Sequence, residues 1–431
     1  MARTPLDAWI AGKTGDLARW QQQQLRETLR QAQHSPYYRA ALPSWETATA
    51  LGDLPTMTSE TLVEQGMRLL CVRPREISRI VSLCTSGSTG HPKRVYFTEQ
   101  DLELTIDFFA HGLTTMVRAR QAMAVCLPCA ATDGVGDLIC RALRRIPVEP
   151  VPYGLIENLE DAARMLVSTQ AQAAVGIPVQ LVSLARFCAR RGIRTNLRKV
   201  LLSTDYVPRA IIRQLRGLWG CEVYEHYGMT EMGLGGGVDC DAHAGCHVRE
   251  NDLLIEIIDA QGHPVPDGHR GEIVFTTLTR RGMPLIRYRT GDRSAILPGN
   301  CPCGSPLRRL APVQGRIDGA LVTRNGTTIR LPEWDEVLFQ ADLIGDYRLL
   351  ATPSLDQLTI AVETQRGWGT AASVERQVRA LLAGFRPAQA LRCDIRVAAQ
   401  DNQLKLHHGN KRTVISTEPP TRFRPVSAWP R

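Results

Sequence analysis

Long apolar runs are missing from this sequence. No run approaches the roughly 20 residues that a membrane-spanning helix needs. The opening residues, MARTPLDAWIAGKTGD, lack the apolar segment of a secretory signal. The Walker A pattern is also missing, because Gly90 is followed by His91 and Pro92 before Lys93 is reached. We therefore expect a cytoplasmic protein without a membrane partner, and any nucleotide site must use a different loop.

The twelve cysteines do not indicate a disulfide framework, because no secretory signal accompanies them in this long chain. Cys126 and Cys129 have the spacing of a redox motif, but a glycine-rich loop follows them where such a motif needs a helix. We interpret them as core and loop. The net charge of +9 favours an anionic ligand. Since Lys and Arg are scattered along the chain, a nucleic-acid partner is not expected.

Length and apolar pattern predict an α/β protein with more than one domain. A chain of 431 residues exceeds the single-core limit of about 250–300 residues. Short apolar runs alternate with helical patterns over 98–227, which is typical of a mostly parallel sheet covered by helices. From 247 onward the pattern predicts antiparallel strands. The last part of the chain predicts a small α+β domain with a helix over 371–382.

Residues 82–102, SLCTSGSTGHPKRVYFTEQDL, combine hydroxyl groups, glycines and one lysine. Apolar residues before the glycines and the run Val95, Tyr96 and Phe97 after them predict a strand, a loop and a second strand. A helix capped by Thr98 should follow. Backbone N–H groups, hydroxyls and a lysine suit a polyphosphate ligand. The alternative is a mobile surface linker, which is the commoner explanation when such a segment is taken alone.

Three further segments carry candidate polar residues. In YEHYGMTEMGLGGG, residues 224–237, Glu231 follows an apolar strand and suits Mg²⁺, although an ordinary turn at the strand end is the alternative. In LIRYRTGD, residues 285–292, Asp292 follows a predicted glycine turn. Its carboxylate could accept hydrogen bonds from ribose hydroxyls, or could be a surface charge. Residues 314–319, QGRIDG, indicate a linker.

Taken in this order and spacing, the four segments resemble the adenylate-forming superfamily of acyl-CoA synthetases and carrier-protein adenylation enzymes. TSGSTGHPK resembles its phosphate loop, YGMTE its central motif, YRTGD its ribose motif and GRID its hinge. The phrases YGMTEMGLGGGVDC, GEIVFTTLTRRGMPLIRYRTGD and CPCG resemble the phenylacetate–CoA ligase-like branch and the related coenzyme F390 synthetases. The resemblance covers residues 35–340 well and the remaining residues poorly.

The resemblance implies a site for ATP and Mg²⁺. Lys93, Thr230 and Glu231 would be catalytic, with Glu231 holding Mg²⁺. Lys411 in LKLHHGNKRTVIS would be the C-terminal catalytic lysine, with Lys405 as the fallback and a basic turn as the alternative. The implied nucleotide-binding residues are Thr85, Ser86, Gly87, Ser88, Thr89, Gly90, Ser203, Thr204, Asp205, Glu225, His226, Tyr227, Gly228, Asp292 and Arg316.

The resemblance also implies an acyl pocket and a hinge. The pocket residues would be Thr132, Asp133, Gly134, Gly176, Ile177 and Pro178. Their small size admits a flat aromatic acid, and Asp133 is either a specificity residue or a loop cap. Asp318 would be the hinge between an N-terminal domain over 1–316 and a small mobile α+β domain over 319–431. The N-terminal domain would combine mixed, mostly parallel sheets with helices and a β-subdomain.

Cysteines and a histidine in CDAHAGCHV and CPCG suit a structural zinc site. Cys240, His247, Cys301 and Cys303 provide four thiolate and imidazole ligands, the number that a tetrahedral Zn²⁺ needs. Members of the resembling branch carry Cys and His at these places. Cys246 and His243 are substitute ligands, and ordinary reduced cysteines are the alternative.

We therefore predict an AMP-forming acid–thiol ligase similar to aryl-CoA ligases. A carboxylate would attack the α-phosphorus of ATP in line, pyrophosphate would leave, and CoA would then take the acyl group from acyl-AMP. The loop VTRNGTTIRLPEWDEV departs from the family pattern where the acceptor would bind. Transfer to a carrier protein and F390-synthetase-like retention of AMP on the product therefore remain alternatives. A non-catalytic nucleotide-binding protein with a zinc-stabilised lobe is a further alternative, and a homodimer is left open.

Overall fold

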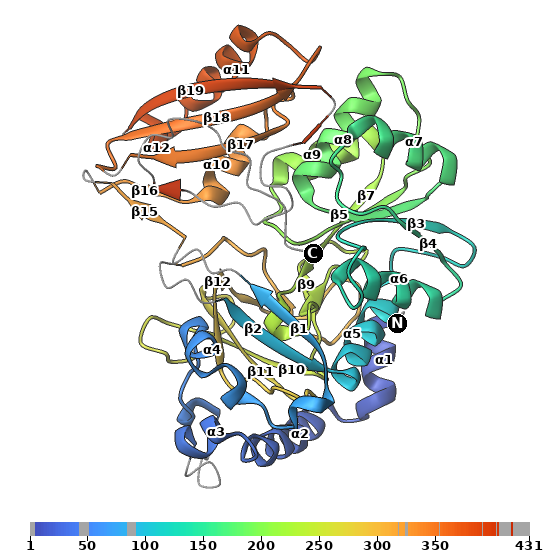
Figure 1. Ribbon diagram of the computed structural model, residues 1–431, viewed down its shortest axis with the longest axis vertical. Coiled ribbons are helices and arrows are strands. Elements are labelled where there is room, and N and C mark those ends of the chain that lie inside the picture. Colours follow the sequence, from blue (N-terminus) through green and yellow to red (C-terminus); the bar gives the residue numbers. More distant parts are fainter. Residues whose placement is uncertain are drawn as a thin grey trace. The chain divides into compact units, whose positions relative to one another are not determined.

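The chain divides into two compact units in the computed structural model (Figure 1). The first unit contains Met1–Ile156, Glu160–Val207 and Ile212–Ile317, and the second contains Glu157–Leu159, Pro208–Ile211 and Asp318–Arg431. The structure describes residues 5–42, 51–83, 92–317, 319–323, 326–352, 354–389, 391–401, 403–404 and 415–416. Among these residues, no helix is both long and apolar enough to cross a membrane.

The first unit begins with helices and with the strand pair on either side of the serine- and glycine-rich loop. These elements are α1 (Pro5–Thr14), α2 (Leu17–Ala32), α3 (Pro36–Ala41), α4 (Ser59–Gln65), β1 (Ile77–Leu83), β2 (Lys93–Thr98) and α5 (Glu99–Leu113). β1 and β2 pair antiparallel, with Leu83 opposite Lys93, which confirms the two strands predicted there. Thr98 caps α5, because its Oγ1 accepts from Asp101 N while the Asp101 carboxylate accepts from Thr98 N.

A nine-stranded sheet of order β13-β14-β9-β8-β7-β6-β5-β3-β4 forms the centre of this unit. Its strands are β3 (Ala122–Cys126), β4 (Glu149–Pro152), β5 (Ala173–Gly176), β6 (Lys199–Leu202), β7 (Glu222–Tyr227), β8 (Gly237–Val238), β9 (Cys246–Val248), β13 (Ile296–Leu297) and β14 (Arg309–Leu310). β3 to β7 are parallel, and the short apolar runs of β3, β5 and β6 are buried on both faces.

Helices cover both faces of the parallel part of this sheet (Figure 1). The helices are α6 (Val135–Arg145), α7 (Leu159–Thr169), α8 (Pro178–Arg190) and α9 (Arg209–Trp219). The chain reverses direction across the sheet after β4, so right-handed crossovers place α6 on one face and α7, α8 and α9 on the other. This arrangement confirms the predicted α/β class.

A three-stranded antiparallel sheet follows, made of β10 (Leu253–Ile258), β11 (Gly271–Thr277) and β12 (Tyr288–Ser294). The predicted glycine turn before Asp292 is wrong, because β12 continues through Gly291 and Asp292. Gly291 has φ 74°, and the pairing with β11 shifts register between Arg289 and Arg293. Glycine tolerates this backbone conformation, so the strand bulges where the sequence suggested that it ended.

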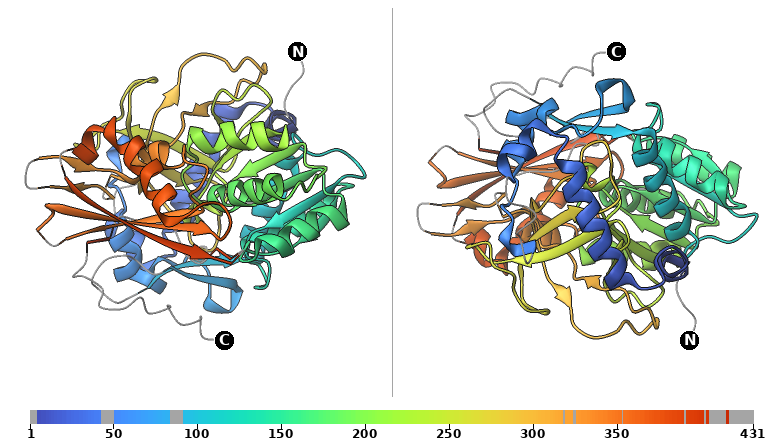
Figure 2. Two further views of the ribbon diagram at one scale, coloured as in Figure 1. Left: turned by 90° about the horizontal axis from the view of Figure 1, so that it is seen from above. Right: turned by 90° about the horizontal axis from the view of Figure 1, so that it is seen from below.

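The second unit contains a four-stranded sheet of order β19-β18-β17-β20. Its elements are β15 (Leu321–Val322), β16 (Thr328–Ile329), α10 (Leu331–Leu338), β17 (Asp346–Ala351), β18 (Gln357–Gln365), α11 (Ala371–Ala383), α12 (Arg386–Gln389), β19 (Arg392–Gln400) and β20 (Ile415–Ser416). α11 connects the parallel strands β18 and β19 and lies across one face of the sheet, with Val374, Val378 and Leu382 buried (Figure 2). The strands and the helix agree with the predicted α+β pattern.

Candidate functional site

Several candidate residues follow the parallel strands of the central sheet at their carboxyl ends, where open α/β sheets bind ligands. β6 ends at Leu202, and the Oγ of the next residue, Ser203, lies 2.9 Å from Nδ1 of His226 on β7. Burial lowers the pKa of His226 to about 4, so its imidazole is neutral at pH 7. The structure therefore brings together two residues of the predicted nucleotide set.

Glu231 lies in the short 3₁₀ turn Thr230–Met232 soon after β7, and 2% of its surface is exposed. The ammonium of Lys93, at the start of β2, contacts Oε1 of Glu231. Tyr288 of β12 donates its hydroxyl to the same oxygen at 3.1 Å. Burial is the largest single effect and opposes ionisation of Glu231, but the charge and hydrogen bond of Lys93, together with hydrogen bonds from the backbone and Tyr288, hold the pKa of Glu231 below its usual value. Two candidates from different motifs thus form a buried ion pair.

The central motif and the ribose motif also meet. Tyr227, the last residue of β7, donates its hydroxyl to Oδ2 of Asp292 at 3.0 Å. Burial raises the pKa of Tyr227 and the Asp292 carboxylate raises it further, so the hydroxyl remains a donor. Asp292 is 7% exposed and forms a backbone bridge with the exposed residue Arg316.

Backbone geometry around the remaining nucleotide candidates is unusual. Thr204 has φ 75°, which is rare for a β-branched residue, and such conformations concentrate at functional sites. Its Oγ1 donates to Ser203 O at 2.6 Å, and Asp205 Oδ1 accepts from the next backbone N–H at 2.8 Å. A Cβ on Gly228 would lie 2.1 Å from Leu234 O, so the tight turn after β7 requires glycine there. Glu225 is half-buried on β7.

The predicted acyl-pocket residues lie in two loops at the same edge of the sheet. Thr132, Asp133 and Gly134 precede α6, and Gly176, Ile177 and Pro178 join β5 to α8. The Asp133 carboxylate forms an ion pair with Arg141 at 2.6 Å. A Cβ on Gly176 would lie 3.1 Å from Cys126 and Leu181, so this position is tightly packed.

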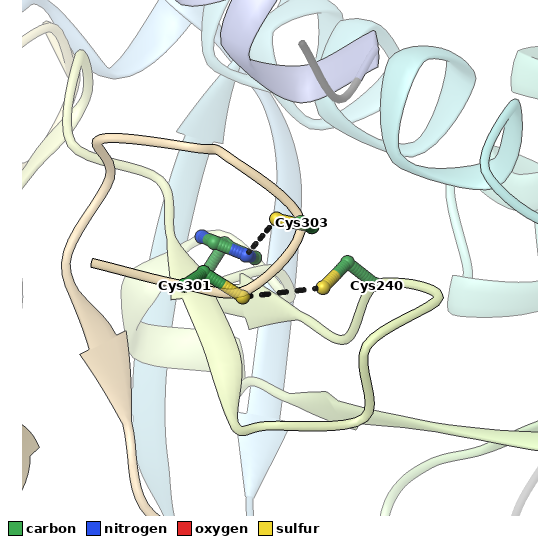
Figure 3. A group of neighbouring side chains, drawn as sticks. Cys240, Cys301 and Cys303 are labelled. Carbon is green, nitrogen blue, oxygen red and sulfur yellow. Dashed lines mark hydrogen bonds between the residues drawn. The ribbon is translucent and has the colours of Figure 1, made fainter. Parts of the chain in front are cut away.

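A cluster of cysteine and histidine ligands is formed by Cys240 in the β8–β9 connection, His247 on β9, and Cys301 and Cys303 in the β13–β14 connection. Figure 3 shows the three cysteines pointing toward one another. Cys240 Sγ is 3.7 Å from Cys301 Sγ, and Cys303 Sγ is 3.4 Å from His247 Nε2. All four ligand atoms lie within 4.8 Å of one another. A tetrahedron with Zn–S bonds of about 2.3 Å has ligand separations of about 3.8 Å, so the four residues fit Zn²⁺.

The substitute ligands have other partners. Cys246 Sγ donates to Glu225 O at 3.6 Å, and His243 Nδ1 lies 2.8 Å from Asp239 Oδ2. Burial lowers the pKa of His247, so its imidazole is neutral and able to donate a lone pair to a metal ion. Burial raises the pKa of Cys240, and a bound metal ion would oppose this shift by favouring the thiolate.

Several predicted residues lie outside the described part of the chain, and their roles stay predictions. These are Thr85, Ser86, Gly87, Ser88, Thr89, Gly90, Asp318, Lys405 and Lys411.

Sequence reasoning missed two residues that contact Glu231. Tyr288 lies four residues before Asp292, and strand alternation places both on one face of β12, so the period of two could have identified it. Arg280, which donates to the carbonyl of Glu231, had no comparable pattern.

Comparison with known proteins agrees with this geometry. The AMP-binding enzyme family matches residues 40–278. The phenylacetate–coenzyme A ligase of Thermus thermophilus is 28% identical over 349 residues, which cover 76% of this chain and 77% of the relative. The phenylacetate–coenzyme A ligase of Pseudomonas putida is 27% identical over 388 residues, covering 84% of this chain and 85% of the relative.

A solved structure of 2-hydroxyisobutyryl-CoA ligase with a bound acyl-AMP has a TM-score of 0.75 and 21% identity. It covers 93% of this chain and 88% of its own, and it supports the fold. The chain belongs to the AMP-binding enzyme family, within the adenylate-forming superfamily and its phenylacetate–CoA ligase-like branch. The resemblance drawn from the sequence motifs is thereby confirmed.

Proposed function

We propose that this protein activates a carboxylic acid with ATP to give acyl-AMP and pyrophosphate, and then transfers the acyl group to the thiol of CoA. The substrate class that the sequence favours is a flat aromatic acid. Relatives named phenylacetate–coenzyme A ligases, spanning most of the chain, support both the reaction class and the acceptor.

This proposal rests mainly on the buried contacts that Lys93 and Tyr288 make with the carboxylate of Glu231. In-line displacement at the α-phosphorus places negative charge on the α-phosphate and on the departing pyrophosphate, so the enzyme has to neutralise charge rather than supply a nucleophile. Lys93 would bind phosphate oxygens and Glu231 would hold Mg²⁺, with Thr230 near the α-phosphate. Mg²⁺, when bound, would supply further charge neutralisation at the phosphates.

The Tyr227–Asp292 pair supports a ribose site beside this centre. An aspartate that is nearly buried and accepts a tyrosine hydroxyl is pre-oriented, and a carboxylate is the group that binds ribose hydroxyls in other nucleotide sites. Ser203, Thr204, Asp205, Glu225, His226 and Gly228 would surround the adenine, Arg316 would assist at the ribose, and residues 85–90 would close over the phosphates.

The two steps would use two arrangements of a C-terminal domain over 319–431, rotating about Asp318. Lys411 would serve the first step, in which a lysine contacts the reacting carboxylate and ATP. Thioester formation would then use a different face of this domain.

We also propose that Cys240, His247, Cys301 and Cys303 hold one structural Zn²⁺. Four protein ligands fill a tetrahedral site and leave no open position for a reacting water, so the role is structural. The bound ion would hold the β8–β9 connection against the β13–β14 loop.

The proposal is tested by pyrophosphate release with ATP, Mg²⁺ and a panel of aryl acids, each with and without CoA. Acid-dependent release that accelerates with CoA, together with a thioester product, is the expected result. Release that CoA does not stimulate would replace CoA by a carrier protein or by an adenylated product. ATP binding without release for any acid would refute the proposed reaction. Glu231→Gln serves as the control, because its loss of Mg²⁺ binding should abolish release.

A further inference from the structure

Arg280 lies in the connection between β11 and β12, with 6% of its surface exposed. Its Nη1 donates to the backbone carbonyl of Glu231 at 2.6 Å, and its Nη2 donates to the backbone carbonyl of Tyr96 at 2.9 Å. The guanidinium carbon lies 4.3 Å from the centre of the Phe97 ring. One side chain therefore joins β2 to the turn that carries Glu231.

The loop that carries Arg280 is itself anchored. The next two backbone N–H groups, those of Arg281 and Gly282, donate to the Asp101 carboxylate at 2.8 and 3.1 Å. A Cβ on Gly282 would lie 2.8 Å from that carboxylate, so the close approach requires glycine. Asp101 also accepts a hydrogen bond from the backbone N–H of Thr98 at the start of α5. Asp101 therefore ties the loop that carries Arg280 to α5, which fixes the position of the guanidinium.

Both segments bound by Arg280 carry residues of the candidate site. β2 begins with Lys93, and the turn contains Glu231, whose side chains contact each other. A guanidinium is a planar fork with fixed directions, so it sets the spacing of two carbonyls in a way that a single ammonium cannot.

Stability alone gives a weak reason for this arrangement. Burying a cation is costly, and apolar side chains in such places often stabilise proteins as well or better. Among the described residues, the Nε of Arg280 has no hydrogen-bond partner. A guanidinium nevertheless stays charged in proteins. Burial lowers the pKa of Arg280, and the nearby carboxylates of Asp101 and Glu231 oppose part of that shift.

We propose that Arg280 is a positioning residue, which fixes the spacing between β2 and the Glu231 turn so that Lys93 and Glu231 act on the same Mg²⁺–nucleotide complex. This inference rests on the proposed function, because it assigns Arg280 to the same site. The Arg280 side chain would not contact the reacting atoms, so its role would be to hold the residues that do.

The test compares Arg280→Met and Arg280→Lys with Arg249→Met. Arg249 is a matched control, since it is 3% exposed, lies 5.1 Å from the Phe108 ring and donates to Leu104 O at 2.7 Å. It also pairs with Asp252. For each protein we would measure thermal unfolding, the affinity for a non-hydrolysable ATP analogue with and without Mg²⁺, and the kcat of pyrophosphate release.

Arg280→Met is expected to lose about 10–100-fold in the Mg²⁺-dependent gain of analogue affinity and in kcat, which is typical when a group that orients a metal ligand is removed. Arg280→Lys should fold and recover only part of this loss, because an ammonium cannot hold both carbonyls in register. Arg249→Met should lose unfolding temperature but keep the Mg²⁺-dependent gain.

The inference is overturned if folded Arg280 variants keep the wild-type gain, or if Arg249→Met loses it to the same extent. If Arg280→Met fails to fold, Arg280→Lys alone decides. The affinity for the analogue distinguishes this inference from the proposed reaction. If the wild-type protein binds the analogue with Mg²⁺ but releases no pyrophosphate, the proposed reaction is refuted. The positioning role of Arg280 is then still decided by comparing the affinities of the variants.

Discussion

The contact between Lys93 and Glu231 predicts a strong coupling that can be measured without any substrate. Both residues are nearly buried, with side-chain exposures of 12% and 2%. Removing one member of a buried ion pair costs about 3–5 kcal/mol, because the other charge stays in a medium that solvates it poorly. Lys93→Met should therefore cost the larger part of this range, since the carboxylate it leaves is the more deeply buried. Glu231→Gln should cost less, because Lys93 can shift toward solvent and Tyr288 can still donate to the glutamine oxygen.

The double variant Lys93→Met, Glu231→Gln removes both charges. Its loss of unfolding free energy should be smaller than the sum of the losses in the two single variants. The expected coupling energy is about 2–3 kcal/mol, at the upper end of the range for residues in contact. The assay is urea unfolding of the free protein, with the four proteins forming a double-mutant cycle. A coupling below about 0.5 kcal/mol would show that the two charges do not face each other, and the reasoning would be refuted.

The pH dependence of the same cycle has a defined sign. In the wild type the folded pKa of Glu231 lies below its unfolded value, so its stabilising contribution is present above the unfolded pKa and is lost as pH falls through the folded pKa. In Lys93→Met, burial remains without the ammonium, so the folded pKa should lie above the unfolded value. The cost of Lys93→Met should then grow as pH rises through that folded pKa, and should be smaller at pH 5 than at pH 8. An equal cost at both pH values would contradict this account.

Three further results are expected. The purified protein should contain about one zinc ion per chain by elemental analysis. Cys301→Ser should lose the metal and unfold at a lower temperature, whereas Cys246→Ser should keep the metal, because the Cys246 thiol donates to the carbonyl of Glu225 instead. Full metal content in Cys301→Ser would rule out the assigned ligand set. Tyr227→Phe should raise the KM for ATP about tenfold and also lower the unfolding temperature, since a hydrogen bond to a charged group contributes about 1.5–3 kcal/mol; an unchanged KM would remove the pair from the ribose site. Lys411→Ala should slow formation of acyl-AMP and spare thioester formation from supplied acyl-AMP, and equal loss of both steps would point to Lys405 or to misfolding.

Local sequence patterns predicted most of the fold because the decisive interactions are local or periodic. Thr98 and Asp101 form a reciprocal cap three residues apart, so the start of α5 can be read from four consecutive residues. The buried strands β3, β5 and β6 are short apolar runs between helical patterns, which is the arrangement that parallel sheets produce. Gly291 was misread because a glycine between polar residues predicts a turn and a bulge alike, and only pairing with β11 distinguishes them.

Residues of the candidate site could be predicted from the sequence only where their own side chains would bind the ligand or the metal ion. Glu231, Asp292 and Lys93 are polar residues in glycine-rich or strand-end contexts, and the chemistry that they can perform follows from their own groups. Tyr288 was within reach of the same reasoning, because the two-residue period of a strand places it on the face of Asp292. Arg280 was not, since its partners are the backbone carbonyls of Glu231 and Tyr96. Every residue has a backbone carbonyl, so the residue type does not indicate which carbonyl accepts a hydrogen bond. The groups that perform the chemistry can therefore be found from residue types, whereas a group that holds the backbone in place becomes visible only when distant segments are brought together.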